Sequence, residues 1–118
     1  MLAIKSVLIP FNIKLGTKKP QELKLILENK DEEKKLLTLA FMVAKDLAVE
    51  STGMNNKLER TIGEMAPGES KTFYFQIFTK PTTTARDYPA RLIIYEHYGD
   101  YKFVQKEYKK DMVIRVVR

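Results

Sequence analysis

The residue best suited to acid–base or metal chemistry is the single histidine, His97. Glu96 and Asp100 lie near it in sequence, but His97 and Glu96 point to opposite faces of a strand. The chain contains no cysteine, which excludes a thiolate metal site, a cysteine nucleophile and a disulfide framework. We therefore expect no bound metal and no other cofactor.

Nucleophilic catalysis finds little support in the sequence. A serine nucleophile needs a base beside it, and Ser6, Ser51 and Ser70 lie in no nucleophile-elbow sequence. The five glycines form no phosphate-cradling loop. We expect that the protein is not an enzyme, and we infer no small-molecule substrate.

The most basic stretch interleaves tyrosine with lysine near the C-terminus, in a chain whose formal net charge is +6. Such interleaving suits phosphate contact combined with base stacking. A nucleic-acid-binding hairpin is therefore an alternative function. The other interpretation is a solvated hairpin whose long charged side chains cover apolar surface. The residues that would bind nucleic acid are Tyr98, Tyr101, Lys102, Lys106, Tyr108, Lys109 and Lys110.

The segment MAPGESKTFYFQIF begins with a Pro67-Gly68 turn and continues as an alternating strand. Its inward face is predicted to carry Phe73, Phe75 and Ile77. Its outward face then carries Tyr74 and Phe78, in addition to polar residues.

The strand from Arg91 to Tyr98 likewise places Ile93 and Tyr95 on the face opposite to Leu92 and Ile94. Outer faces of sandwiches are normally polar, so the set Tyr74, Phe78, Ile93 and Tyr95 is predicted to bind a protein partner or a second copy as a homodimer. The alternative is that the segment Asp31 to Glu50 covers this face.

That segment, Asp31 to Glu50, fits two structures. As a helix it would be capped by Asp31 and would bury a leucine- and alanine-rich stripe. As two strands it would turn Leu37, Leu39, Phe41 and Val43 inward and bend near Lys45-Asp46, before a short strand from Leu47 to Val49. We favour the strands because the flanking segments alternate.

The remaining pattern is also that of strands. Ile4 to Leu15 reads as an edge strand broken near Pro10, and Leu23, Leu25 and Leu27 alternate with polar residues. The stretch from Tyr101 to Arg118 is long, with a kink or loop expected at EYKKD. Seven to eight strands without βαβ alternation predict an all-β protein, an antiparallel immunoglobulin-like β-sandwich with Greek-key connections, as a single domain over residues 1–118.

Three stretches, LKLILENKD, IGEMAPGESKTFYFQI and DYPARLIIYEH, carry a resemblance to immunoglobulin-like and fibronectin-III-like domains. The chain most resembles the CARDB-type modules of archaeal and bacterial proteins. The matching positions are Asn29, Pro67-Gly68 with the strand after it, and Tyr88, over about residues 20–117. The resemblance implies an archaeal-type interaction or assembly module, and it implies that Tyr88 forms a buried corner.

The sequence also bears on the cellular location of the protein and on the organism it comes from. No apolar run is long enough for a membrane span, and the first residues lack the features of a signal peptide. We expect a cytoplasmic protein, or a cell-surface one if a leader has been removed. The Lys- and Glu-rich, Cys-free and Trp-free composition is typical of a thermophile.

Overall fold

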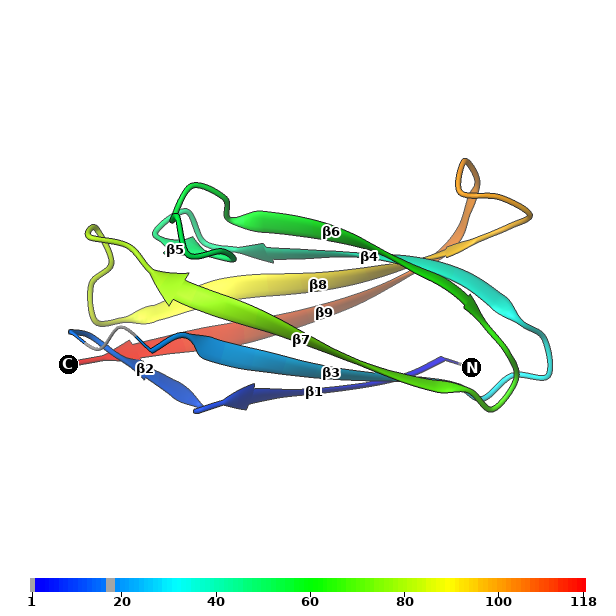
Figure 1. Ribbon diagram of the computed structural model, residues 1–118, viewed down its shortest axis with the longest axis horizontal. Coiled ribbons are helices and arrows are strands. Elements are labelled where there is room, and N and C mark those ends of the chain that lie inside the picture. The colour runs from blue at the N-terminus through cyan, green and yellow to red at the C-terminus, as the bar shows by residue number, and fades with distance from the viewer. Residues whose placement is uncertain (1, 17–18) are drawn as a thin grey trace.

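The computed structural model describes residues 2–16 and 19–118, which form two packed β-sheets (Figure 1). Among these residues there is no helix that could cross a membrane. The strands are β1 (Leu2–Ile9), β2 (Asn12–Lys14), β3 (Gln21–Asn29), β4 (Lys35–Val43), β5 (Leu47–Ala48), β6 (Lys57–Met65), β7 (Ser70–Thr79), β8 (Asp87–His97) and β9 (Val104–Val117).

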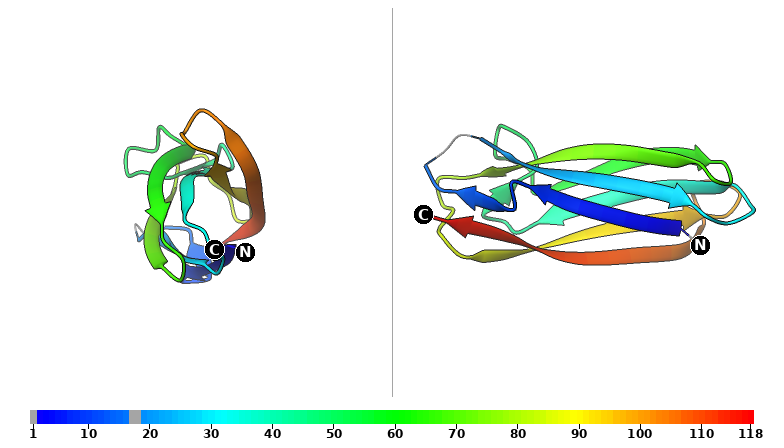
Figure 2. Two further views of the ribbon diagram at one scale, coloured as in Figure 1. Left: turned by 90° about the vertical axis from the view of Figure 1, so that its right-hand side faces the viewer. Right: turned by 90° about the horizontal axis from the view of Figure 1, so that it is seen from below.

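The first sheet has the order β1-β3-β7-β5, and the second has the order β2-β9-β8-β4-β6. Figure 2 shows the two layers from the end and from below. All pairings are antiparallel except that of β2 with β9. The predicted immunoglobulin-like sandwich is thus confirmed. The strand count exceeds the prediction because the first strand divides at the cis Ile9–Pro10 bond, and each part joins a different sheet.

The core lies between the sheets and follows the predicted alternation. Leu23, Leu25 and Leu27 of β3 have no exposed surface, and Phe75 and Ile77 of β7 face them from the neighbouring strand. Burying each leucine contributes about 1.5–3 kcal/mol. The second sheet supplies the other half of the core through alternate residues of β4, β8 and β9.

The segment from Asp31 to Glu50 forms strands, as favoured, and no helix. β4 buries Leu37, Leu39, Phe41 and Val43, and β5 follows the turn at Lys45-Asp46. The segment does not cover an outer face, because β4 lies within the second sheet between β8 and β6. Pairing with two long strands outweighs the local helix propensity.

The kink expected at EYKKD is wrong. β9 continues through these residues in unbroken register with β8, from Lys106 opposite Glu96 to Arg115 opposite Asp87. The irregularity lies instead at the hairpin end, between Glu96 and His97. The alternation of Tyr108, Lys110 and Met112 toward the core accommodates the charged residues without a bend.

Asn29, one of the residues that carried the family resemblance, is fully buried at the end of β3. Its amide nitrogen donates to the carbonyls of Glu33 and Met65 at 2.9 and 3.0 Å, and its side-chain oxygen accepts from the Asp31 amide at 3.1 Å. This side chain therefore links the loop before β4 to the turn after β6.

Tyr88 forms the predicted corner at the start of β8. Its ring is 1% exposed, and its hydroxyl donates to the Thr84 carbonyl while accepting from the Thr84 amide, both at 3.0 Å. The hydroxyl thereby fixes the loop that leads from β7 into β8. A buried hydroxyl with two main-chain partners is a structural element.

Replacing Tyr88 with phenylalanine should lower the free energy of unfolding by about 1–2 kcal/mol, because the Thr84 main chain loses both of its partners. Urea unfolding followed by circular dichroism measures the difference. Tyr74→Phe is the matched control, since Tyr74 is 56% exposed and should unfold like wild type. Equal midpoints for the two variants would contradict the structural role of the corner.

Candidate functional site

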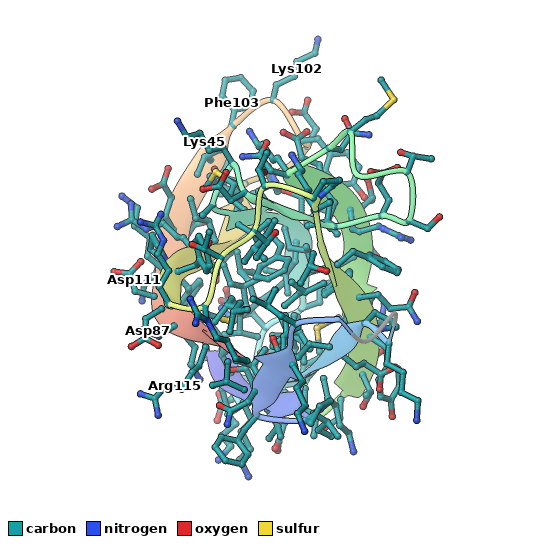
Figure 3. The ribbon with its side chains drawn as sticks, turned by 90° about the vertical axis from the view of Figure 1, so that its left-hand side faces the viewer. Lys45, Asp87, Lys102, Phe103, Asp111 and Arg115 are labelled. Atoms are coloured by element: carbon teal, nitrogen blue, oxygen red, sulfur yellow. The ribbon has the colours of Figure 1, made fainter. Side chains whose placement is uncertain are left out.

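The loop between β8 and β9 carries the most exposed cluster of large apolar side chains outside the N-terminal strand. We call Tyr98, Phe103 and Val104 the hairpin tip, and they are 72%, 62% and 50% exposed. The loop rises away from the sandwich in Figure 1, and Figure 3 shows Phe103 and Lys102 standing clear of the other side chains. The Asp100 carboxylate accepts from the Lys102 amide at 2.8 Å and so shapes the turn.

Below the tip, three aromatic rings fix the base of the hairpin. The His97 ring lies 5.5 Å from the Tyr101 ring, edge to face, and 6.5 Å from the Tyr95 ring. These rings line a groove of about 610 Å³ on the outer face of the second sheet. We call this surface the hairpin groove, and its other lining residues are Thr38, Leu39, Ala40, Glu59, Arg60, Thr61 and Val104.

His97 uses only one of its ring nitrogens. Nε2 shares a hydrogen bond of 2.7 Å with the Thr38 hydroxyl, whereas Nδ1 is buried and has no partner among the described residues. A buried polar atom without a partner costs about 1–3 kcal/mol, and such atoms call for an explanation. The ring that carries this atom lies edge to face with the Tyr101 ring and lines the groove.

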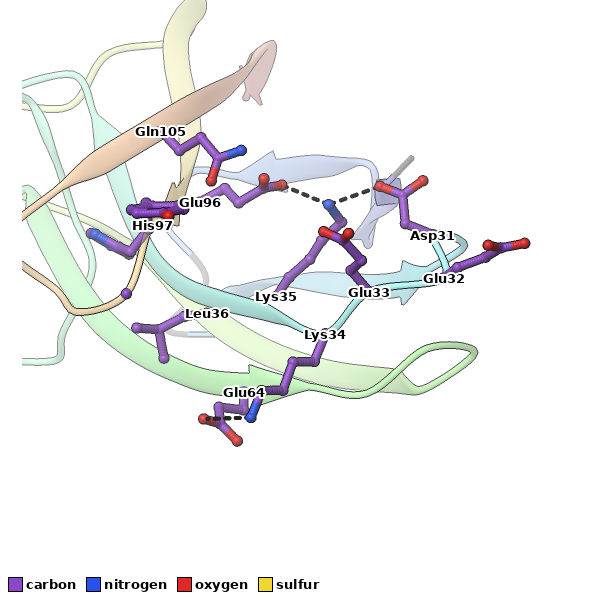
Figure 4. A pocket seen from close by; sticks show the side chains of 12 residues that line it. Asp31, Glu32, Glu33, Lys34, Lys35, Leu36, Glu64, Glu96, His97 and Gln105 are labelled. Atoms are coloured by element: carbon purple, nitrogen blue, oxygen red, sulfur yellow. Dashed lines mark hydrogen bonds and ion pairs between the residues drawn. The ribbon is translucent and has the colours of Figure 1, made fainter.

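The inner face of the same strands holds a charged network. Lys35 Nζ lies 2.9 Å from Glu96 Oε1 and 2.8 Å from Asp31 Oδ2, and the Tyr108 hydroxyl donates to Glu96 Oε1 at 3.0 Å. The Lys35 and Glu96 side chains are only 9% and 10% exposed. Figure 4 shows them in a pocket of about 620 Å³ at the end of the sandwich. The network ties β4, β8 and β9 together where the hairpin leaves the sheet.

The network shifts the ionisation of two of its members. Burial opposes the charge on Glu96, but the hydrogen bonds from Lys35 and Tyr108 outweigh it and lower the pKa of Glu96. Burial raises the pKa of Tyr108, and the neighbouring Glu96 carboxylate raises it further. Glu96 is therefore an ionised anchor and Tyr108 a neutral donor near pH 7.

The rest of the outer face of β8 and β9 is occupied by ion pairs. Arg91 Nε lies 2.7 Å from Asp111 Oδ1, and Arg115 Nε lies 3.2 Å from Asp87 Oδ1. Asp87, Asp111 and Arg115 are labelled on this side of the molecule in Figure 3. These charges satisfy one another across the strands, and the exposed Val113 lies between the two pairs in the register.

The predicted protein-binding set does not form one face. Tyr74 and Phe78 lie on β7 in the first sheet, whereas Ile93 and Tyr95 lie on β8 in the second. Alternation along each strand indicated an outward side chain, but the outer faces of two packed sheets point in opposite directions. Ile93 is also only 8% exposed, between Ala40 and Lys109 in the register. Tyr95 alone joins the hairpin groove.

The residues proposed for nucleic acid are likewise divided. Tyr98, Tyr101 and Lys102 remain together in the loop. Lys106 and Tyr108 lie on the inward-facing side of β9, with the Lys106 ammonium 4.9 Å from the centre of the Tyr108 ring. Lys109 lies on the opposite side, 3.7 Å from Glu107. Tyr108 packs against the core and cannot stack on a base there.

Sequence reasoning missed Phe103, Val104 and the role of His97. The available signal was the Gly99-Asp100 turn flanked by aromatic residues, because a turn of that kind places its neighbours at a hairpin tip. Within residues 2–16 and 19–118 no cluster of three or more histidine or acidic side chains is arranged to hold a metal ion.

The sequence matches no family model, and a search of curated proteins finds no significant match. Solved structures do share the fold. A structure of native alpha-2-macroglobulin from Escherichia coli, spanning domain MG7 to the C-terminus, matches 99% of this chain with a TM-score of 0.72 at 16% identity. A cryo-EM structure of the same E. coli protein matches 97% with a TM-score of 0.64 at 17% identity.

This chain covers 16% and 6% of those two macroglobulin chains. A third structure, described as "AvmM Catalyzes Macrocyclization in Alchivemycin A Biosynthesis", matches 99% of this chain and 89% of its own, with a TM-score of 0.58 at 9% identity. The chain is thus an immunoglobulin-like β-sandwich similar to modules of alpha-2-macroglobulin. At these identities the likeness shows the fold alone.

The lowered pKa of Glu96 predicts a pH-dependent contribution to stability. An unfolded glutamate titrates near pH 4.3, so the stabilisation from Glu96 is complete above that value and is lost as the pH falls through the lower folded pKa. Glu96→Gln should cost about 1–2 kcal/mol near neutral pH, and this cost should shrink as the pH falls below about 4.3. Chemical unfolding across this pH range measures the difference.

Glu64→Gln is the matched control. Glu64 pairs with Lys34 at 3.7 Å, and its side chain is 65% exposed. An exposed pair of this kind contributes under about 1 kcal/mol. A Glu96→Gln cost that stays constant with pH would refute an ionised, stabilising Glu96.

Proposed function

We propose that this protein is a non-enzymatic protein-interaction module that binds its partner through the hairpin tip and the hairpin groove. The observation that supports this proposal is the exposure of Tyr98, Phe103 and Val104 on a loop with a braced base. Contiguous exposed apolar side chains are characteristic of interaction surfaces. Aromatic anchors also supply much of the binding energy at protein interfaces.

The bracing favours tight binding. A loop that is already held in one conformation loses little entropy when it binds. Here the His97–Tyr101 contact holds the loop from the outer face, and the Glu96–Tyr108 hydrogen bond holds the strands from the inner face. The partner that fits is a protein with an apolar pocket for Phe103 and a segment that lies in the groove.

The groove also carries polar groups suited to a peptide segment. Glu59 of β6 lies at one rim, and the Thr38 and Thr61 side chains lie between that rim and the rings of the hairpin. The Arg60 guanidinium points to the other face of β6, 6.0 Å from the centre of the Phe75 ring. An apolar centre with a polar rim is the usual anatomy of a protein interface.

Nucleic acid remains the alternative ligand, supported by the exposed grouping of Tyr98, Tyr101 and Lys102. Aromatic side chains in a basic loop can stack on unpaired bases. Glu107 beside Lys109 and the inward placement of Tyr108 weaken that surface. Protein binding is therefore the proposal, and nucleic-acid binding is an outcome of its test.

Peptides selected on the wild-type protein from a random library, with counter-selection on Phe103→Asp, should bind with a measurable dissociation constant. Phe103→Asp and Tyr98→Asp should each weaken a selected peptide about tenfold or more, because they place a charge in the apolar contact. Isothermal titration measures the affinities. Tyr74→Asp, on the other sheet, is the matched control and should bind like wild type.

Mixed-sequence single-stranded oligonucleotides serve as the competing probe. Wild-type protein should bind them weakly, and any binding should disappear steeply with added salt. Failure to select any peptide that depends on Phe103, together with oligonucleotide binding lost on Lys102→Glu, would overturn the proposal in favour of the alternative.

The proposal also covers the family of the protein and the kind of organism it comes from. Asn29 and Tyr88, on which the resemblance to CARDB-type modules rests, are both buried and hydrogen-bonded to the main chain. We infer membership of that group and, from composition, an archaeal and thermophilic source.

A further inference from the structure

The N-terminal strand β1 forms an outer edge of the first sheet and pairs only with β3 among the described strands. The chain leaves this sheet at Pro10, and β2 then pairs with the far end of β9. Within residues 2–16 and 19–118 no strand pairs with the main-chain groups along its other side.

Protein edges are normally protected by charge or by irregular backbone. β6 and β9 follow this rule, since each carries at least four charged residues, and the pairing of β6 with β4 contains a register shift. Two main-chain acceptors of β6 are also occupied, because Lys71 Nζ of β7 donates to the carbonyls of Ile62 and Glu64 at 3.1 and 3.2 Å.

β1 lacks these protections. It pairs with β3 over its whole length without a register shift, and Lys5 is its single charged residue. Val7 and Ile9 point outward and are 52% and 51% exposed, and Phe11 just beyond the strand is 72% exposed. An apolar, regular edge of this kind is a template for another strand.

We propose that β1 pairs antiparallel with β1 of a second copy, so that the two first sheets form one continuous sheet. The axis relating the copies is perpendicular to the sheet, so opposite residues must belong to the same face. In this antiparallel pair, the residue numbers of any two opposing residues must therefore add up to an even number. Sums of 10 and 12 pair seven residues of each β1 strand, whereas sums of 8 and 14 pair only five.

The register in which the residue numbers add up to 12 gives the most favourable side-chain contacts between the two copies. It places Ser6 opposite Ser6 of the second copy, Lys5 opposite Val7, and Ala3 opposite Ile9. Lys5 then lays its aliphatic stem on a valine, and no like charges are opposed. A sum of 10 would oppose the two Lys5 side chains, which is destabilising, and a sum of 14 would leave Leu2 to Ile4 unpaired.

This register makes the interface testable by charge. Val7→Lys places a lysine opposite Lys5 twice, once on each side of the axis, and should dissociate the dimer. The double variant Lys5→Glu with Val7→Lys converts both contacts into ion pairs and should restore it. Val113→Lys is the matched control, because Val113 is 55% exposed on β9 and should leave the dimer unchanged.

Sedimentation equilibrium over a concentration series measures the association, with circular dichroism as the test of folding. Wild type should show a reversible monomer–dimer equilibrium, and Val7→Lys should be a folded monomer. Strictly monomeric wild type would overturn the proposal. So would a dimer that persists in Val7→Lys but dissociates in Phe103→Asp, since that result would assign self-association to the hairpin tip.

Cross-linking tests the register itself. The natural chain has no cysteine, so Ser6→Cys introduces a single thiol at the axis, where the two Cα atoms would lie about 4.5–5.5 Å apart. Oxidation should yield a disulfide-linked dimer. Thr72→Cys, on the exposed face of β7 in the same sheet, should remain monomeric, and equal cross-linking of the two variants would contradict the register.

Discussion

The ion pair between Lys35 and Glu96 is the interaction on which the candidate site depends. It places two charges in a nearly buried position and satisfies them with Asp31 and the Tyr108 hydroxyl. A carboxylate there needs its partners, because an unpaired buried charge is costly. Glu96 therefore holds β4 and β9 against β8. The next residue, His97, lies on the outer face, where its hydrogen bond to Thr38 fixes the base of the hairpin.

The fold could be predicted because its signals are local and repeat along the chain. The period-two pattern of Leu23, Leu25 and Leu27 indicates which face is buried whatever the strand pairs with. The same reasoning resolved Asp31 to Glu50, since two neighbouring strands stabilise an extended chain more than leucine and alanine favour a helix. The corner at Tyr88 was implied by the resemblance to immunoglobulin-like domains, and its hydroxyl bonds the main chain of Thr84, four positions earlier.

The candidate site could not be predicted in the same way. Alternation indicates that Tyr74 and Ile93 point outward, but only the strand order places them on different sheets. Tyr108 looked like part of a basic surface, yet its bond to Glu96 depends on the pairing of β8 with β9. The expected kink at EYKKD failed for a related reason, because charged residues at an edge strand need no break in its ladder.

The division of the first strand also determines how the molecule responds to force. β1 begins toward one end of the long axis in Figure 1 and β9 ends at the other, and β2 runs parallel to the end of β9. Tension between the start of β1 and the end of β9 therefore pulls along the β1–β3 and β2–β9 pairs, so the hydrogen bonds of each pair share the load. If the two terminal strands were instead antiparallel neighbours, the same tension would break the hydrogen bonds between them one after another from the pulled end.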